Sequence, residues 1–245
     1  MSNTKTAGII IIGNEILSGK LHEGNSFFLA SELRELGVSV RRIAVIPDEI
    51  KLIGREAYEF SKTYDYVFTS GGVGPTHDDV TMAGIAHGFG VKLIPHPELE
   101  SFLTKKYKDI LTGAMLKIAQ VPEGTEVISF KEMRFPVVVF KNIFIFPGIP
   151  DYLKNKFSLI KERFRSSPFY LKRIFLNHTH ESLIADTLTG IALENKDVDI
   201  GSYPIENNPE HCIIITVESK SEGAFKKTLA ALKAKLPENI IVRVE

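Results

Sequence analysis

A nearly continuous apolar run, Thr6–Ile12, stands close to the amino end and is rich in isoleucine. A strand with this composition is typical of a parallel sheet, where helices cover both faces. Strand-like runs recur at 38–46 and 66–68. Between them, apolar residues fall at helical spacing around 25–36 and 48–60. This β-α-β-α-β order predicts an α/β fold, with a three-layer, mostly parallel sheet and right-handed crossovers.

The two helical stretches begin at polar residues that are common helix caps. Asn25 starts the first and Asp48 the second, so we expect both to act as N-caps. Gly37 is expected to end the first helix, because glycine readily adopts the left-handed conformation found there.

The rest of the first half predicts further alternation. We expect a short strand at 91–94, a helix at 98–111 begun by Pro97, and a strand at 121–129. The apolar stretch 135–146 predicts a hairpin that turns at Lys141-Asn142, and a helix is expected from about 151 to 165.

A composition change marks a domain boundary near residue 167. Ser166-Ser167-Pro168 is typical of a linker. The predicted order after it is β-α-β-β-α-β, as in a small split βαβ, ferredoxin-like unit. We therefore expect two domains, 1–167 with the α/β fold and 168–245 with a small α+β fold.

The strongest candidate site is the segment Ser70–Asp79, between a predicted strand and a predicted helix. In this layout, backbone N–H groups and a helix N-terminus converge on a phosphate. Gly71, Gly72 and Gly74 let the backbone approach a ligand closely, and Thr76 adds a hydroxyl donor. The segment therefore predicts a phosphate-binding loop.

Two adjacent aspartates, Asp78 and Asp79, follow this loop. A lone aspartate at a helix start is commonly an N-cap. Two carboxylates beside a phosphate repel it unless a cation intervenes, and Mg²⁺ is often held by one or two carboxylates plus phosphate oxygens. We expect one aspartate to cap the helix and the other to face the ligand. Whether the pair also contacts a metal ion stays open at this point.

Other loops are expected to join the same site, because ligands bind outside the carboxyl ends of parallel strands. Glu15 is read equally well as a solvated loop carboxylate, and Asp48 first as a cap. Lys5, Lys20, Arg134 and Lys141 are candidate phosphate partners that spacing cannot rank. The expected substrate-binding residues are Gly13, Glu15, Asp48, Ser70, Gly71, Gly72, Gly74, Thr76, Pro147 and Gly148.

The overall charge argues against two kinds of partner. The 30 basic and 30 acidic residues give a formal net charge of zero, so nothing attracts nucleic acid or an anionic membrane in general. No run approaches the ~18 apolar residues of a membrane span, and the amino-terminal run is too short for a signal peptide. We expect a cytoplasmic protein whose partner is a small molecule.

Four ordered motifs resemble one family. Thr69–Thr81 resembles the signature of the MoaB/MogA (molybdopterin-binding) fold, in the branch of CinA-type proteins and the amino-terminal domain of eukaryotic-type FAD synthases. Gly8–Gly19, Val45–Glu49 and the segment from Arg134 to Pro150 agree with it. The last is more similar to the FAD synthase branch. The module after residue 170 resembles, by element order alone, the KH-type middle domain of CinA proteins.

The resemblance implies a metal-dependent pyrophosphatase that acts on ADP-ribose or FAD. The aspartate essential in the family aligns with Asp79, and Asp78 is expected beside it, both as catalytic residues and as ligands of Mg²⁺, Mn²⁺ or Co²⁺. No bound organic cofactor is expected, although molybdopterin stays open. The alternatives are molybdopterin binding with adenylyl transfer, and a non-catalytic nucleotide-binding module. Relatives associate, so a homo-oligomer is expected.

The sequence departs from the family at two site positions. Asn14 replaces the aspartate of a Gly-Asp-Glu motif, and Asp78 replaces a basic residue; both favour metal-dependent hydrolysis over pterin chemistry. We expect neither a nicotinamide-mononucleotide deamidase domain nor an FAD-synthesising domain in this chain. Residues 166–245 lack the Gly-x-x-Gly of nucleic-acid-binding KH domains, so no nucleic acid is expected.

Overall fold

The computed structural model describes residues 4–131, 135–166 and 169–245. The chain divides into two compact units, Met1–Ser166 and Ser167–Glu245. Within the described ranges, no helix combines the length and apolar character needed to cross a bilayer.

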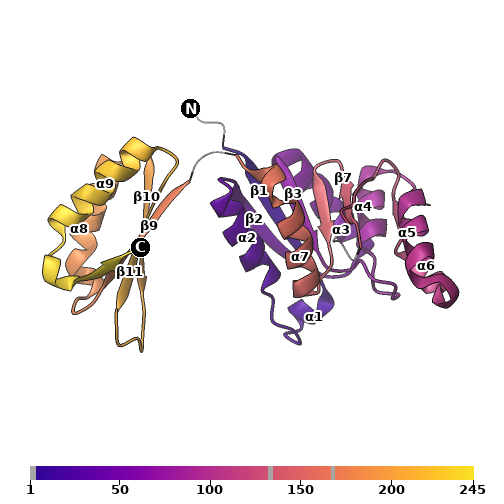
Figure 1. Ribbon diagram of the computed structural model, residues 1–245, viewed down its shortest axis with the longest axis horizontal. Coiled ribbons are helices and arrows are strands. Elements are labelled where there is room, and N and C mark those ends of the chain that lie inside the picture. The colour runs from indigo at the N-terminus through magenta and orange to yellow at the C-terminus, as the bar shows by residue number, and fades with distance from the viewer. Residues whose placement is uncertain (1–3, 132–134, 167–168) are drawn as a thin grey trace. The chain divides into compact units, whose positions relative to one another are not determined.

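A mixed sheet forms the centre of the first unit, in the strand order β2-β1-β3-β8-β7-β6 (Figure 1). The first four strands of that order are parallel, whereas β7 pairs antiparallel with both β8 and β6. The carboxyl ends of the four parallel strands therefore share one edge of the sheet. The strands are β1 (Thr6–Ile12), β2 (Ser39–Ile46), β3 (Tyr66–Ser70), β6 (Glu126–Ile128), β7 (Val137–Phe140) and β8 (Ile143–Phe146).

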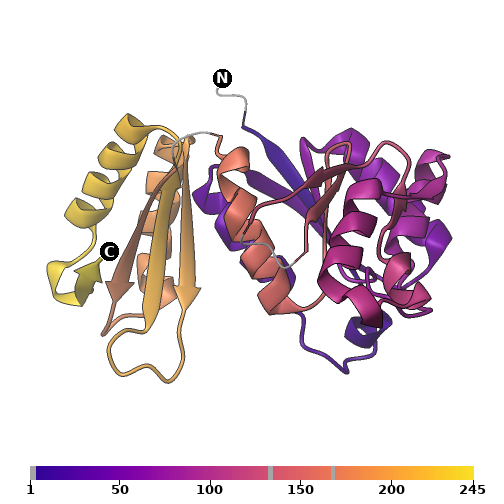
Figure 2. The ribbon, with the colours of Figure 1, turned by 45° about the vertical axis from the view of Figure 1, so that its right-hand side comes forward.

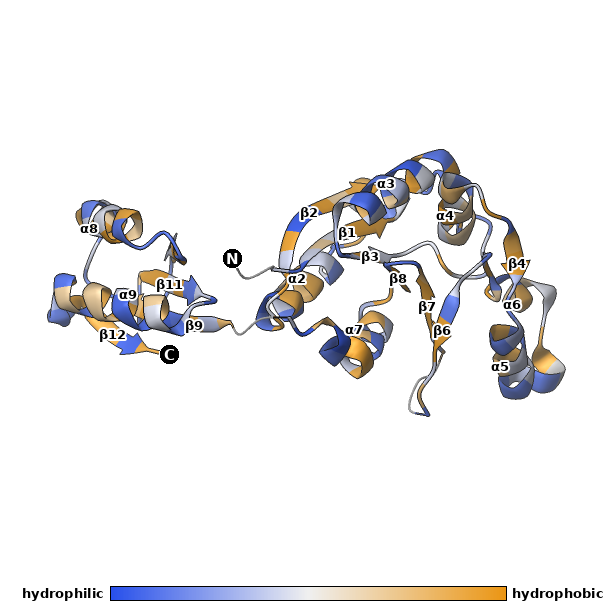
Figure 3. Ribbon diagram, turned by 90° about the horizontal axis from the view of Figure 1, so that it is seen from above, coloured by the Kyte–Doolittle hydropathy of each residue, from blue (hydrophilic) through white to orange (hydrophobic). Residues whose placement is uncertain are grey.

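Helices cover both faces of this sheet, as Figure 3 shows from above. On one face, α2 (Asn25–Glu35) and α7 (Pro150–Ile160) pack in a core with Ile9 and Ile11 of β1. On the other face, α3 (Ile50–Thr63) and α4 (Thr81–Phe89) pack in a core with Ile10 and Ile12. Alternate residues of β1 thus enter opposite cores, which explains why its whole sequence is apolar. The expected three-layer, mostly parallel architecture is confirmed.

The prediction of one strand at 121–129 was wrong. This stretch forms two strands: β5 (Gln120–Pro122) pairs antiparallel with β4 (Leu93–Pro95), and β6 joins the main sheet. Gly124, with φ +91°, lies between them, in a conformation that side chains other than glycine rarely adopt. The turn therefore divides the stretch, and its two halves pair with strands of different sheets.

Short helices complete the first unit. The predicted loop 13–19 contains α1 (Asn14–Leu17), and α5 (Pro97–Tyr107) begins at its proline as expected. A further short helix, α6 (Gly113–Lys117), follows α5, while α7 ends at Ile160 and a 3₁₀ turn continues it to Phe164.

The second unit is a small α+β fold with strand order β10-β11-β9-β12, all antiparallel (Figure 2). Both of its helices share one hydrophobic core with the same face of this sheet. The predicted β-α-β-β-α-β order is confirmed. Its elements are β9 (Tyr170–Leu176), α8 (Glu181–Glu194), β10 (Val198–Pro204), β11 (Ile213–Ser219), α9 (Glu222–Lys235) and β12 (Ile241–Val244).

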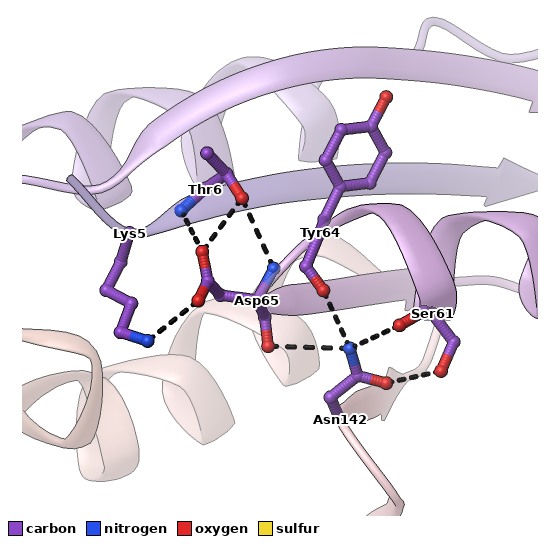
Figure 4. A network of polar contacts seen from close by, with 6 residues as sticks. All are labelled: Lys5, Thr6, Ser61, Tyr64, Asp65 and Asn142. Carbon is purple, nitrogen blue, oxygen red and sulfur yellow. Dashed lines mark hydrogen bonds and ion pairs between the residues drawn. The ribbon is translucent and has the colours of Figure 1, made fainter. Parts of the chain in front are cut away.

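A network of hydrogen bonds connects the segments at the amino ends of β1 and β3 with the β7–β8 turn (Figure 4). The Asp65 carboxylate accepts hydrogen bonds from Lys5 Nζ at 2.7 Å and from the Thr6 N–H at 2.8 Å. The Asn142 amide, in the β7–β8 turn, donates to the Tyr64 carbonyl at 2.8 Å and to the Ser61 carbonyl at 3.0 Å. Lys5, a candidate phosphate partner, therefore forms an ion pair with Asp65 and does not line the cavity described below.

Asp65 is expected to make stability depend on pH in the acid range. Its hydrogen bonds, first from Lys5 and then from Thr6, lower its pKa from 3.8 to about 2. Because the folded pKa is depressed, the stabilisation is present above pH 3.8 and is lost as the pH falls to about 2. Asp65→Asn should therefore lower the free energy of unfolding by about 1 kcal/mol at pH 6, after allowance for solvent screening, and by nearly nothing at pH 2. Denaturant unfolding across this range measures the difference; an equal loss at every pH would contradict it.

Candidate active site

A cavity of about 1190 Å³ opens at the carboxyl ends of the parallel strands. Ile12 of β1, Ser70 of β3 and Pro147 after β8 contribute to its wall. Drug-sized ligands commonly occupy roughly 300–1,000 Å³, so this cavity has room for a ligand of dinucleotide size.

The glycine loop, residues 71–76, contributes to the cavity wall, and its backbone conformation and hydrogen bonds determine its shape. Gly71 and Gly72 have φ values of +109° and +63°. A Cβ on Gly71 would overlap the Ile12 carbonyl oxygen. Thr81, the first residue of α4, donates from its N–H to the Gly72 carbonyl at 3.0 Å and from its hydroxyl to the Gly71 carbonyl at 2.9 Å. Glycine is therefore required here both for conformation and for space.

Asp79 closes the turn of this loop. Its Oδ2 accepts hydrogen bonds from the Thr76 N–H at 2.8 Å and from the Thr76 hydroxyl. A Cβ on Gly74 would lie 2.6 Å from the same oxygen, so the carboxylate lies in the curve of the loop. Within the described ranges Oδ1 has no hydrogen-bond donor, which leaves it available for a ligand.

The expected helix cap at the aspartates was wrong. The N-cap of α4 is Val80, and no side chain caps the helix. Helix α4 begins at Thr81, after both aspartates, and Thr76 engages Asp79 instead. Asp78 has a side chain that is 62% exposed and lies 4.0 Å from His77 Nδ1.

Asp48 is not a cap either. The N-cap of α3 is Glu49, and the Asp48 Oδ2 accepts a hydrogen bond from the Asn14 N–H at 2.8 Å. This hydrogen bond therefore connects the loop after β2, which holds Asp48, to the loop after β1, which holds Asn14. Burial is the main cause that raises its pKa, and the negative charges of Glu15, Asp78 and Asp79 raise it further. Carboxylates from three loops thus act on one another here, which favours a cation among them.

The structure brings together most of the predicted site residues in the cavity wall. The predicted residues that line the cavity are Glu15, Ser70, Gly71, Gly72, Gly74, Asp79, Pro147 and Gly148. The other four, Gly13, Asp48, Thr76 and Asp78, are not among the residues that line it.

Sequence analysis missed the role of Asn25, which is only 6% exposed. Its amide donates to Ser70 Oγ at 3.0 Å and to the Gly148 carbonyl at 2.7 Å. The expected N-cap role was wrong: Gly24 is the N-cap, and the Glu23 carboxylate accepts from the Ser26 N–H at 2.9 Å. The partners of Asn25 lie 45 and 123 positions away, so local spacing carries no signal of this contact.

The basic residues of the site also differ from the candidates. Lys117 of α6 donates from Nζ to the Thr76 carbonyl, and Lys156 of α7 lines the cavity. Lys141 instead lies near the Phe89 and Phe140 rings. Lys20 is exposed and contributes nothing to the wall described for the cavity, and Arg134 lies outside the described residues.

The donor set suits a hard divalent ion held jointly with a substrate. In the ranges that the structure describes, no group of three or more His, Cys, Asp or Glu side chains could hold a metal ion by itself. Mg²⁺ commonly takes only one or two carboxylates plus substrate phosphates. Asp79 and Glu15 line the cavity beside the glycine loop and fit that requirement.

Comparison with known families divides the chain where the compact units divide. Residues 8–166 match the family model described as probable molybdopterin binding domain, and residues 168–245 match the FAD synthase middle domain.

Individual relatives agree with this division. A protein of Archaeoglobus fulgidus is 38% identical over 196 residues, which cover 80% of this chain and 84% of that protein. A probable FAD synthase of Caenorhabditis briggsae is 33% identical over 97% of this chain, which spans 50% of that relative. The crystal structure of CinA from Thermoplasma acidophilum, a protein of unknown function, is 32% identical with a TM-score of 0.61, covering 66% of this chain and 99% of that one.

Proposed function

Since the chain belongs to the probable molybdopterin-binding domain family, with CinA and FAD synthase relatives, we propose that it hydrolyses the diphosphate bond of a nucleotide such as ADP-ribose or FAD with a divalent metal ion. The observation that carries the proposal is the pairing of a glycine loop with the cavity-lining carboxylates Glu15 and Asp79. A phosphate group and a divalent cation satisfy these two features together.

Different residues of the cavity would bind the phosphate and the metal ion. The backbone of the glycine loop would receive one phosphate. Asp79 and Glu15 would hold the ion, and the two hydrogen bonds from Thr76 orient the Asp79 carboxylate toward it. The expectation that Asp78 is a second ligand gives way to Glu15, because Asp78 is exposed outside the wall. Bound in this place, a divalent ion would polarise phosphorus and lower the pKa of an attacking water.

The rest of the cavity suits a nucleoside. Ile16, Leu21 and Met82 give apolar surface, while Tyr107 and Phe135 give aromatic rings. A heterocyclic base gains by packing on such surfaces. An ordinary phosphate-binding protein would not need this surface, so it supports a nucleotide over a free phosphate.

The family description favours a second candidate, a pterin. Molybdopterin carries a ring and a phosphate, which the same cavity would accept. Tight binding of molybdopterin without nucleotide cleavage would select this candidate, or adenylyl transfer with it. Nucleotide binding in calorimetry without turnover in any metal would select a non-catalytic module. We also propose a homo-oligomer located in the cytoplasm, which light scattering and cell fractionation measure.

A substrate screen tests the hydrolase proposal. ADP-ribose, FAD, NAD and CoA are each incubated with Mg²⁺, Mn²⁺ or Co²⁺, and mononucleotide release is measured by chromatography. We expect release from ADP-ribose or FAD with at least one of the metals, and none when EDTA replaces them. Failure of every substrate and metal pair would reject the hydrolase proposal.

A further inference from the structure

Lys156 is a charged residue of the cavity wall to which the proposed chemistry gives no role. Lys156 lies on α7 and its ammonium faces Phe135, with Nζ 4.9 Å from the ring centre. It donates a hydrogen bond to the Pro136 carbonyl at 2.9 Å. An ammonium has three donors, so two remain for other acceptors.

Lys156 also has no counter-charge among the residues that the structure describes. Among the described residues, no carboxylate lies within ion-pair distance of it. Burial lowers its pKa to about 8, and no opposite charge offsets that effect. The group remains mostly charged at neutral pH, and a largely desolvated cation gains by binding an anion.

The strand register gives the approximate distance between Gly71 and Pro136, whose carbonyl accepts the hydrogen bond from Lys156. The Gly71 N–H donates to the Phe146 carbonyl at 3.2 Å, which places Gly71 next to the end of β8. Pro136 precedes β7, the next strand, where Val138 pairs with Ile145. Since neighbouring strands are about 4.8 Å apart, roughly 10 Å separate Gly71 from Pro136.

Lys156 Nζ lies 2.9 Å from the Pro136 carbonyl oxygen, so the ammonium and the glycine loop border the same cavity at two separate positions. Two linked phosphates offer one anionic group to each of these two positions, whereas a monophosphate offers only one group. The glycine loop and the Lys156 ammonium can then each hold one phosphate.

We propose that Lys156 binds the second phosphate of a diphosphate ligand whose first phosphate occupies the glycine loop, and that it thereby selects diphosphates over monophosphates. The inference deepens the proposed function, since it rests on a nucleotide as the ligand. It concerns binding alone and requires no cleavage.

Calorimetric binding of ADP and AMP tests the inference, with Ca²⁺ in one series and EDTA in another. We expect the unmodified protein to bind ADP more tightly than AMP in at least one series. In that series Lys156→Met should weaken ADP binding roughly tenfold or more, as expected for a lost charged hydrogen bond, and leave AMP binding nearly unchanged. Lys156→Arg, which keeps the charge and the donors, should retain the preference for ADP.

Lys154→Met is the matched control. Lys154 is exposed on the same helix, 5.7 Å from the Phe28 ring, and is absent from the cavity wall described above. It should leave both affinities unchanged. Equal loss of ADP and AMP binding in Lys156→Met, no loss, or an unmodified protein without a preference for ADP would overturn the inference.

This test separates the inference from the hydrolase proposal, because it measures no turnover. A Lys156-dependent preference for ADP in a protein that cleaves nothing would reject only the hydrolase. Normal cleavage with an unchanged KM in Lys156→Met would reject only the role of Lys156.

Discussion

Asp79→Asn is expected to lower kcat for mononucleotide release by a factor on the order of 10³, with little change in melting temperature. Asparagine keeps an oxygen that can accept the two hydrogen bonds from Thr76, so the glycine loop should keep its shape. The negative charge beside the phosphate is lost, and with it the attraction for a divalent ion. Steady-state kinetics on the best substrate of the screen, together with thermal unfolding, measure both effects.

Asp78→Asn is the matched control. It removes the same charge from the residue next to Asp79, but the Asp78 carboxylate is exposed to solvent. We expect turnover to fall much less in this variant. Asp79→Ala should also abolish turnover, and it additionally removes the acceptor for Thr76. Unchanged kcat in Asp79→Asn would exclude a catalytic role for this carboxylate.

Gly71→Ala is expected to destabilise the first unit by about 3 kcal/mol or more. Two causes add: a φ of +109° is unfavourable for alanine, and its Cβ would overlap the Ile12 carbonyl oxygen of the neighbouring strand. Neither backbone can move freely, because the Gly71 N–H is bonded to Phe146 across the sheet. Scanning calorimetry measures the loss.

Gly19→Ala separates the two causes. Gly19 has a φ of +70° but nothing within 4 Å of a Cβ, so only the conformational cost of about 1 kcal/mol applies. An equal loss in both variants would show that the overlap with Ile12 contributes nothing.

The architecture could be predicted because its signals are local. The apolar run of β1, the helical spacing in α2 and α3, and the turn at Asn142 each depend on neighbours in sequence. The same is true of the glycine loop, whose residue types restrict the backbone wherever they occur. The parallel order then brings the loops after β1, β3 and β8 to one edge without further information.

The details of the site could not be predicted in the same way. Asn25, Asp48 and Asp79 all stand near helix starts, where capping is the usual local role. Asn25 instead bonds to Ser70 and Gly148, and Asp48 to Asn14, all on other segments, whereas Asp79 bonds to Thr76 within its own loop. A shift of one or two residues in the helix start decides between these roles, and spacing cannot resolve it.

The two lysines near the cavity were missed for a related reason. Lys117 and Lys156 lie on helices that follow the glycine loop by many residues, and neither stands in a motif. Only the folded chain places their ammonium groups at the cavity or its loop.

The Asn25 amide has a consequence for the rates of ligand binding. It holds the end of β3 and the Gly148 carbonyl in one buried arrangement before any ligand arrives. Ligand binding then requires little ordering of these segments, because they lose most of their conformational entropy when the protein folds. Association should accordingly be similar for ligands of similar charge, and differences in affinity among them should lie mainly in how slowly they dissociate.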